Sequence, residues 1–200
     1  MHITGQRTVT IVALLLLAAA ATQAIYTALY LTMPDVSRRP LWGIEGILFV
    51  LLAAFAGSAL AQTRRLHLGW SAIMAAAVLN VVQVGVGLTM FGSLSDAAQA
   101  NPSLAPVLGA VVAFSFMVYN AAKVLLALAA IVFGLGRMAT RSRASGGVIA
   151  GVGFVALISN ALSMALGRDG LGDVPLAGGS GVLATLLLAL CLFTLPADDR

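Results

Sequence analysis

The sequence predicts an all-α integral membrane protein, a compact bundle of about six transmembrane helices with both termini in the cytoplasm. Composition is the first reason. Of the 200 residues 60% are hydrophobic and only 9% are charged, and the mean hydropathy is +1.03. A soluble domain carries about 25% charged residues, so this chain has too few to cover a surface that faces water. The second reason is that the hydrophobic residues form six runs, each near the length of about 20 residues that crosses a bilayer.

The six runs follow one another closely, and we expect residues 1–200 to form a single membrane domain. The predicted spans are residues 8–32, 41–62, 69–94, 106–136, 146–167 and 178–195. The first run follows Arg7 and opens like a signal peptide, but it continues past Ala24 as far as Leu31. That is longer than a normal secretory core, so we interpret it as an uncleaved first helix, with cleavage as the alternative.

Short connections carrying arginine, aspartate or both separate the spans. They are residues 33–40, 63–68, 95–105, 137–145 and 168–177. None is long enough to fold by itself. We therefore expect any function to reside in the helices or at their ends.

The arginines predict the orientation, because positive charges collect on the cytoplasmic side of membrane proteins. With both termini inside, the inner segments hold seven arginines: Arg7, Arg64, Arg65, Arg137, Arg141, Arg143 and Arg200. The outer loops hold three, Arg38, Arg39 and Arg168, together with Asp35, Asp96, Asp169 and Asp173. The first outer loop, with two arginines, is the exception. Short alanine-rich spans and the lack of targeting features favour the bacterial inner membrane.

Several classes of function are excluded by residue type. The net charge of +4 and the pI near 10.0 come from short basic clusters between apolar runs, so we expect no nucleic-acid partner. The single cysteine, Cys191, excludes an internal disulfide and a multi-cysteine metal site. Haem needs axial ligands and zinc needs a His, Asp or Glu cluster, and the spans contain neither. We expect no cofactor and no metal.

The segment Gly178–Gly179–Ser180–Gly181 resembles the nucleophile motif of rhomboid intramembrane proteases. A serine nucleophile needs a nearby base. The two histidines, His2 and His67, both lie outside the apolar runs, and no later helix follows the motif to supply another. We therefore interpret the segment as a glycine-rich turn that opens the last helix.

The one glutamate and the one lysine of the chain, Glu45 and Lys123, both fall inside predicted spans. An ionisable group at the centre of a bilayer costs about 2.5–3.5 kcal/mol on insertion scales, so such groups usually face the bundle interior and mark function. Lys123 is far from either end of its run. Glu45 lies four residues into its run, and a carboxylate reaching the outer headgroups is the simpler alternative there.

Polar residues of five predicted helices fall at the same depth. Lys123 is 14 residues from Arg137, and Glu45 is 19 residues from Arg64. The other members lie between these limits from their own inner arginines: Gln23, Tyr26, Asn80, Gln83, Tyr119, Asn120 and Asn160. At about 1.5 Å per residue, these counts place one polar layer in the outer half of the membrane. Steps of four, as from Ser115 to Tyr119 to Lys123, place such residues on one helix face.

Three functions fit this layer. The first is binding or transport of a small polar or amphiphilic solute in a pocket open to the outside, with Lys123 and Glu45 facing an anionic, cationic or zwitterionic ligand. The second is a non-catalytic accessory or assembly subunit of a larger membrane complex. The third, and least favoured, is a membrane enzyme acting on a lipid or quinone-like substrate, with Lys123, Glu45 and Tyr119 as acid–base groups.

A structural role is the alternative to all three, because interhelical hydrogen bonds or a Glu45–Lys123 ion pair would hold a bundle together without a ligand. Small residues suit close helix packing in either case, and we expect it at Ala53, Gly57 and Ala61 and at Gly147 and Gly151. Six spans, inner termini and an outward-facing polar layer are similar in architecture to the substrate-capture subunits of energy-coupling-factor vitamin transporters. No signature motif matches, so the resemblance assigns no binding residue.

Overall fold

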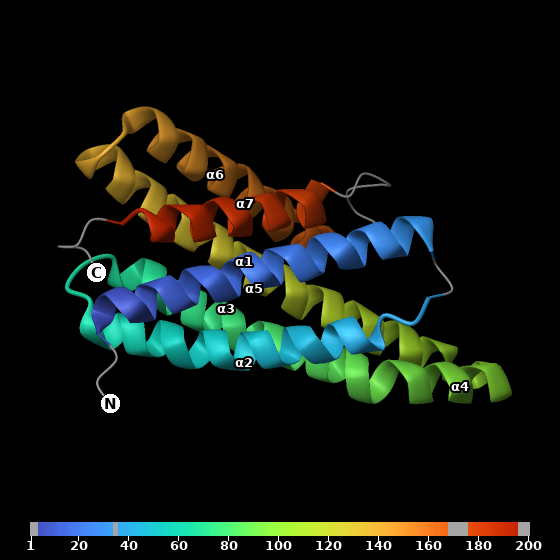
Figure 1. Ribbon diagram of the computed structural model, residues 1–200. Coiled ribbons are helices and arrows are strands. Elements are labelled where there is room, and N and C mark those ends of the chain that lie inside the picture. Colours follow the sequence, from blue (N-terminus) through green and yellow to red (C-terminus); the bar gives the residue numbers. More distant parts are fainter. Residues whose placement is uncertain (1–3, 34–35, 168–175, 196–200) are drawn as a thin grey trace.

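The computed structural model describes residues 4–33, 36–167 and 176–195, and the regular secondary structure of these ranges is entirely helical (Figure 1). In chain order the elements are α1 (Gly5–Thr32), α2 (Arg39–Gln62), α3 (His67–Val86), the π-helical turn η1 (Gly87–Phe91), α4 (Gly92–Ala100), the 3₁₀ turn η2 (Pro102–Leu104), α5 (Ala105–Thr140), α6 (Arg143–Leu166) and α7 (Leu176–Phe193).

Six helical stretches of the described chain are long and apolar enough to cross a membrane. They are Gly5–Thr32, Arg39–Gln62, His67–Ala100, Pro102–Thr140, Arg143–Leu166 and Leu176–Phe193. The prediction of an all-helical protein with six such helices is confirmed.

The third and fourth stretches are longer than predicted. Residues 95–100, which we expected to be a connection, are helical, because the helix that begins at His67 continues through η1 into α4. The helix ends at Asn101, whose side-chain oxygen accepts hydrogen bonds from the backbone N–H of Ser103 at 3.2 Å and from its hydroxyl at 2.8 Å. The hydrophobic pattern missed this extension because α4 is polar and buries none of its residues.

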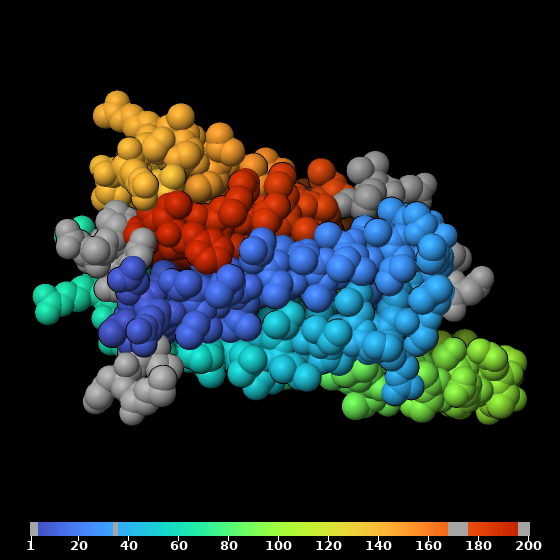
Figure 2. All heavy atoms as spheres, in the orientation of Figure 1, coloured from blue at the N-terminus to red at the C-terminus, as the bar shows by residue number. Residues whose placement is uncertain are grey.

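Five helices form a ring. α1 packs against α2, α2 against α3, α3 against α5, α5 against α7, and α7 against α1. α6 lies outside this ring against α5 and α7, and Figure 2 shows α1 flanked by α2 and α7 on one face of the molecule. α1 and α5 are not close neighbours along their described backbones, so any contact between them must be made by side chains across the middle of the ring.

The two ends of the bundle differ in charge. α1 begins and α7 ends at the same end (Figure 1), which also receives the connections from α2 to α3 and from α5 to α6. Six of the eight arginines in the described ranges lie at this end, which we call the arginine-rich end: Arg7, Arg64, Arg65, Arg137, Arg141 and Arg143. Arg38 and Arg39 lie at the opposite end.

The interior is apolar toward the arginine-rich end. Trp70 and Phe133 pack there edge to face with ring centroids 4.9 Å apart, and neither is exposed. The same part of the core holds fully buried side chains of α1, α2 and α7: Val9, Val12, Leu16, Leu52, Leu188 and Leu192. The buried polar side chains Gln23 and Glu45 come from parts of their helices nearer the opposite end, and Lys123 lies at the middle of α5.

Glycines allow α5 and α6 to pack with their backbones in contact. A Cβ atom added at Gly134 would lie 2.7 Å from the backbone nitrogen of Ala150, and one at Gly153 would lie 2.9 Å from the backbone oxygen of Ala127. A Cβ at Gly146 would lie 2.6 Å from the oxygen of Gly134. Backbone atoms cannot move aside as a flexible side chain can, so this interface requires the absence of a side chain at these positions.

The expected close packing at Gly147 and Gly151 is not found. Nothing in the described residues lies within 4 Å of a Cβ added at either position. The packed glycines, Gly146 and Gly153, are neighbours of the expected pair in sequence, and a shift of one or two residues turns a helix by about 100–200°. Gly147 and Gly151 therefore lie on the face of α6 that points away from α5.

We predict that Gly153→Ala lowers the free energy of unfolding of the detergent-solubilised protein by about 1–3 kcal/mol, because the added methyl group overpacks a backbone contact. Gly151→Ala is the matched control on the same helix, since its methyl group meets open space. That control should be neutral or slightly stabilising, because alanine favours helix formation over glycine. Equal stability of the two variants in thermal melts would contradict the packing described for α5 and α6.

Candidate functional site

Lys123 is the most deeply enclosed charged side chain of the described chain. It lies on α5, and none of its surface is exposed (0%). Its ammonium group donates a hydrogen bond to the Oε1 atom of Gln23 on α1. The Nζ atom also lies 5.3 Å from the centre of the Tyr119 ring, one turn earlier on α5. Because α1 and α5 are not adjacent in the ring, Lys123 joins them across its interior.

The stem of Lys123 rests against the backbone of α7 at Gly181. A Cβ added there would lie 3.0 Å from Cδ and 3.3 Å from Cγ of Lys123, and 3.5 Å from the Nδ2 atom of Asn160 on α6. The absence of a side chain at Gly181 thus gives the lysine its path to Gln23 and brings the amide of Asn160 next to it. The sequence identified Gly181 only as part of a turn, because the neighbour that requires a glycine lies on another helix.

Glu45 is the second buried charge, with 5% of its surface exposed on α2. Its carboxyl group lies beside the hydroxyl of Thr22 on α1 and within electrostatic range of Lys123. The two charged groups are nevertheless more than 4 Å apart, since the described residues contain no ion pair between them. The Oε1 atom of Glu45 is buried and has no hydrogen-bond partner among the residues described. Glu45 and Lys123 are therefore close enough to interact electrostatically but form no ion pair in the described structure.

Tyr119 and Tyr26 extend this group toward the end of the bundle that carries Arg38. Both are half-buried. Tyr119 lies within electrostatic range of Glu45 and of Tyr26. Tyr26 in turn stacks on Trp42 with ring centroids 6.0 Å apart. The enzyme interpretation named Tyr119 together with Glu45 and Lys123, and these three side chains do lie in one neighbourhood.

Asn160 completes the group from α6, with none of its surface exposed. Its Nδ2 atom donates hydrogen bonds to the backbone oxygens of Ala156 at 2.8 Å and Ala177 at 3.0 Å. The Oδ1 atom is buried and, within the described ranges, accepts no hydrogen bond. We call the side chains of Lys123, Gln23, Glu45, Thr22, Tyr119 and Asn160 the Lys123 cluster.

For the remaining predicted residues, the described structure shows no hydrogen bond to this cluster. Asn80 and Asn120 are buried, but the Nδ2 atom of each donates within its own helix, to the oxygens of Ala76 and Phe116 at 2.9 Å. The Oδ1 atom of Asn80 has no partner in the described structure. Gln83 is half-buried on α3. These three residues belong to the predicted layer by depth alone.

Ser180 has no histidine partner within the described residues. Its hydroxyl shares a 2.8 Å hydrogen bond with the hydroxyl of Ser159 and donates to the oxygen of Ala177. His67 lies at the arginine-rich end, where its ring contacts the oxygen of Thr63 at 2.9 Å. The bond to Ser159 joins α7 to α6, and residues 178–181, which we interpreted as a turn, already lie within α7.

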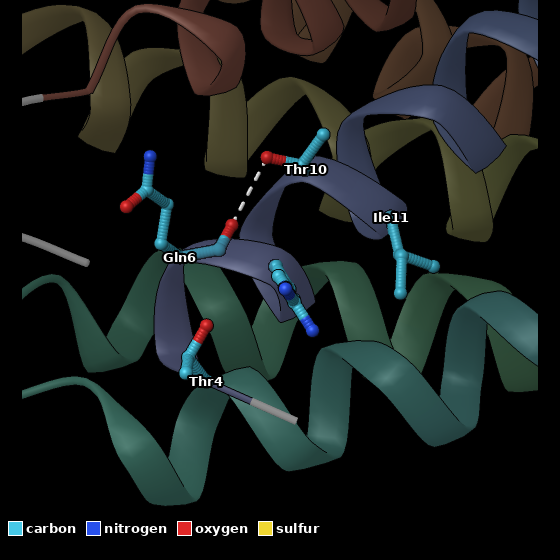
Figure 3. A pocket seen from close by; sticks show the side chains of 5 residues that line it. Thr4, Gln6, Thr10 and Ile11 are labelled. Atoms are coloured by element: carbon cyan, nitrogen blue, oxygen red, sulfur yellow. Dashed lines mark hydrogen bonds between the residues drawn. The ribbon is translucent and has the colours of Figure 1, made fainter. Parts of the chain in front are cut away.

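A pocket at the arginine-rich end contains none of the predicted site residues. Figure 3 shows it on the first turns of α1, lined by Thr4, Gln6, Arg7, Thr10 and Ile11. The hydroxyl of Thr10 donates to the oxygen of Gln6 at 3.0 Å, so part of its polar lining is already satisfied within the helix.

No group of three or more His, Cys, Asp or Glu side chains that would hold a metal ion occurs in the described part of the chain. Comparison with protein-family models, with curated proteins and with solved structures finds no significant match to this chain. The similarity to vitamin-capture subunits therefore gains no support from these comparisons, and the site is interpreted from its own geometry.

We predict that Gln23→Leu and Lys123→Met are energetically coupled. A hydrogen bond to a charged group contributes about 1.5–3 kcal/mol, and either single change leaves a buried partner without it. The double variant should therefore recover about that much of the summed losses in unfolding free energy. Asn120→Leu is the control, because Asn120 bonds only within its own helix. The loss of unfolding free energy in Asn120→Leu should simply add to that in Gln23→Leu. If the losses in Gln23→Leu and Lys123→Met were also additive, the Lys123–Gln23 bond would be contradicted.

Proposed function

We propose that this chain is a multi-pass protein of the bacterial inner membrane with both termini in the cytoplasm, and that the Lys123 cluster binds a small polar solute for capture or transport. The membrane assignment is supported by six apolar helices and by large hydrophobic side chains exposed on their outer faces. Examples are Leu14, Ile47, Val78, Met117, Phe154 and Leu190. The orientation is supported by the arginine-rich end, which would face the cytoplasm.

The observation that carries the solute proposal is that the side chains around the buried Lys123 include two buried acceptor atoms without a described donor. Glu45 Oε1 and Asn160 Oδ1 have no partner in the described structure, and each such group costs about 1–3 kcal/mol. Lys123 has three N–H donors, and Gln23 accepts from one of them. An occupant that carries both donors and acceptors would satisfy both sides. Amino acids, amino alcohols and hydroxylated solutes have this chemistry.

The structure corresponds to an enclosed conformation of the proposed site. Lys123 and Asn160 have no exposed surface, so the open access that the sequence suggested is not seen at these residues. A solute would enter when helices around the cluster separate. The neighbours of Gly181 are side-chain atoms, the flexible stem of Lys123 and the amide of Asn160, and these can shift more easily than backbone atoms.

The experiment is a thermal-shift screen of the protein in detergent against small solutes that carry both donors and acceptors. A solute present at 100 times its Kd stabilises the folded protein by about 2.7 kcal/mol. We expect at least one solute to raise the melting temperature of the wild type and of Asn120→Leu, and not that of Lys123→Met or Glu45→Gln. A solute that shifts all four proteins equally binds elsewhere and would refute the proposed site.

The same variants without solute separate a binding site from a structural ion pair. A buried pair loses about 3–5 kcal/mol when one partner is removed, and much of that returns in the double variant. Because Glu45 and Lys123 form no ion pair within 4 Å, we expect weak coupling between Glu45→Gln and Lys123→Met. Strong coupling together with an empty solute screen would favour a structural role.

A second candidate function, an accessory subunit of a membrane complex, is favoured by the outer face of α6. Gly147 and Gly151 are four residues apart there and have no described residue against them. Small residues at this spacing let a second helix approach closely within a membrane. Exposed Val148, Phe154 and Val155 flank them.

For this candidate we predict that Gly151→Leu releases a co-purifying membrane partner, because a large side chain would hold the two helices apart. The measurement is the apparent mass of the detergent-solubilised complex in size-exclusion chromatography with light scattering. Gly85→Leu is the control, since Gly85 on α3 also meets open space in the described structure. A single monomeric species for the wild type would remove this candidate.

A further inference from the structure

The first turn of α2 carries two arginines at an electrostatically unfavourable position. Arg38 occupies the N-cap and Arg39 begins the helix, and no acidic residue lies in the first turn. A helix N-terminus has partial positive charge, so anions are stabilised there and cations are not. Arg38 and Arg39 are also the two described arginines that lie away from the arginine-rich end. Something other than membrane orientation must account for them.

Among the described residues, the contacts of the Arg38 side chain are with two aromatic rings. Its guanidinium carbon lies 5.6 Å from the centre of the Tyr26 ring and 5.2 Å from that of Tyr30, both on α1. Its Nη1 atom is buried and, in the described structure, has no hydrogen-bond partner. A guanidinium group has five N–H donors in a planar fork. The stacking therefore orients the group and leaves the Nη1 donors without a partner in the described structure.

The aromatic frame around Arg38 is itself well supported. Tyr26 stacks between Tyr30, at 6.5 Å, and Trp42, at 6.0 Å. Trp42 packs edge to face on Phe91 at 5.8 Å, and a Cβ added at Gly87 would lie 3.1 Å from the Trp42 ring. These contacts join α1, α2 and η1 at one end of the bundle. Arg38 is thus fixed before any ligand arrives.

Arg39 provides a second cation on the same turn. Its Nη2 atom donates to the backbone oxygen of Leu88 at 3.2 Å, which holds the side chain against η1. One hydrogen bond leaves most of its donors for another partner. One carboxylate cannot accept from all the donors of two adjacent guanidinium groups and a helix N-terminus. A phosphate has several acceptor oxygens and binds arginine in a bidentate manner, so it matches these donors better.

We propose that Arg38 and Arg39, framed by Tyr26, Tyr30 and Trp42, form a phosphate-binding site at this end of the bundle, separate from the Lys123 cluster. The phosphate can belong to a lipid headgroup or to a soluble molecule. The lipid is the expected source, because tyrosine and tryptophan at the ends of apolar helices mark the depth at which headgroups lie.

The test uses the purified full chain in a maltoside detergent, which contains no phosphate. Trp70→Phe leaves Trp42 as the one tryptophan of the chain, so its fluorescence reports on the site. Three probes are titrated: a short-chain phosphatidylglycerol, a short-chain diacylglycerol without phosphate, and inorganic phosphate. We expect the phosphatidylglycerol to change the fluorescence with saturation and the diacylglycerol to have no such effect. Saturation by inorganic phosphate would also support the site and would identify a soluble phosphate as a sufficient ligand.

Arg38→Gln should weaken phosphate binding about tenfold or more, as expected for loss of a hydrogen-bonded charge. Arg38→Lys keeps the charge without the planar fork and should lie between Arg38→Gln and the wild type. Arg64→Gln is the matched control, because it removes the same charge at the exposed opposite end of α2. Circular dichroism checks that every variant keeps its helices, and Arg38→Lys preserves the test if Arg38→Gln unfolds.

Asp35 of the same connection lies outside the described residues, and Asp35→Asn tests whether its carboxylate takes the place of the phosphate. Binding that is unchanged or tighter in this variant supports the proposal. Three results would overturn the proposal. The first is phosphate binding that appears only in Asp35→Asn, and the second is a similar loss of affinity in Arg38→Gln and Arg64→Gln. The third is the lack of a saturable response to either phosphate probe.

Discussion

The interior of this protein is organised by one buried cation, Lys123, and its hydrogen bond to Gln23. Burial of an ammonium group costs several kcal/mol, so the helices around it must supply compensating contacts. α1 provides the acceptor, α5 provides the Tyr119 ring, and α7 provides the space at Gly181. Since α1 and α5 do not pack directly, the lysine fixes the distance across the ring. Lys123 thus links three helices, α1, α5 and α7.

The remaining interior separates into two halves with different consequences. Toward the arginine-rich end, Trp70, Phe133 and aliphatic residues fill the ring, and the glycines between α5 and α6 allow backbone contact. Buried polar atoms without a described partner occur in both halves, for example Trp70 Nε1 in this half and Glu45 Oε1 in the other. The halves differ in charge, because the buried charged side chains Glu45 and Lys123 lie outside the apolar part of the core.

The sequence predicted features that depend on one helix and missed those that depend on two. Run lengths predicted the six apolar helices, and spacing along a helix predicted that Gln23, Lys123 and Asn160 face inward. Glu45 was identified by its charge within an apolar run, and it is buried as well. The role of Gly181 could not be predicted, because it depends on a lysine of another helix. Choosing Gly147 and Gly151 over their neighbours failed for the same reason, since many small residues on α6 fit the required spacing. The extension into α4 was missed because polar residues give no hydrophobic signal.

The extended helix that ends in α4 makes one end of the bundle uneven. Figure 1 shows α4 projecting past the end of α1, and its first residue, Gly92, lies beside Arg39. In the proposed membrane arrangement, this polar segment would stand in water while the apolar helices next to it stop at the lipid. Large molecules approaching from this side would then meet α4 before they reach Arg38 and Arg39. An antibody or an inserted epitope at α4 would be accommodated without entering the membrane, and it would shield the arginines at its base from bulky partners while small solutes still pass.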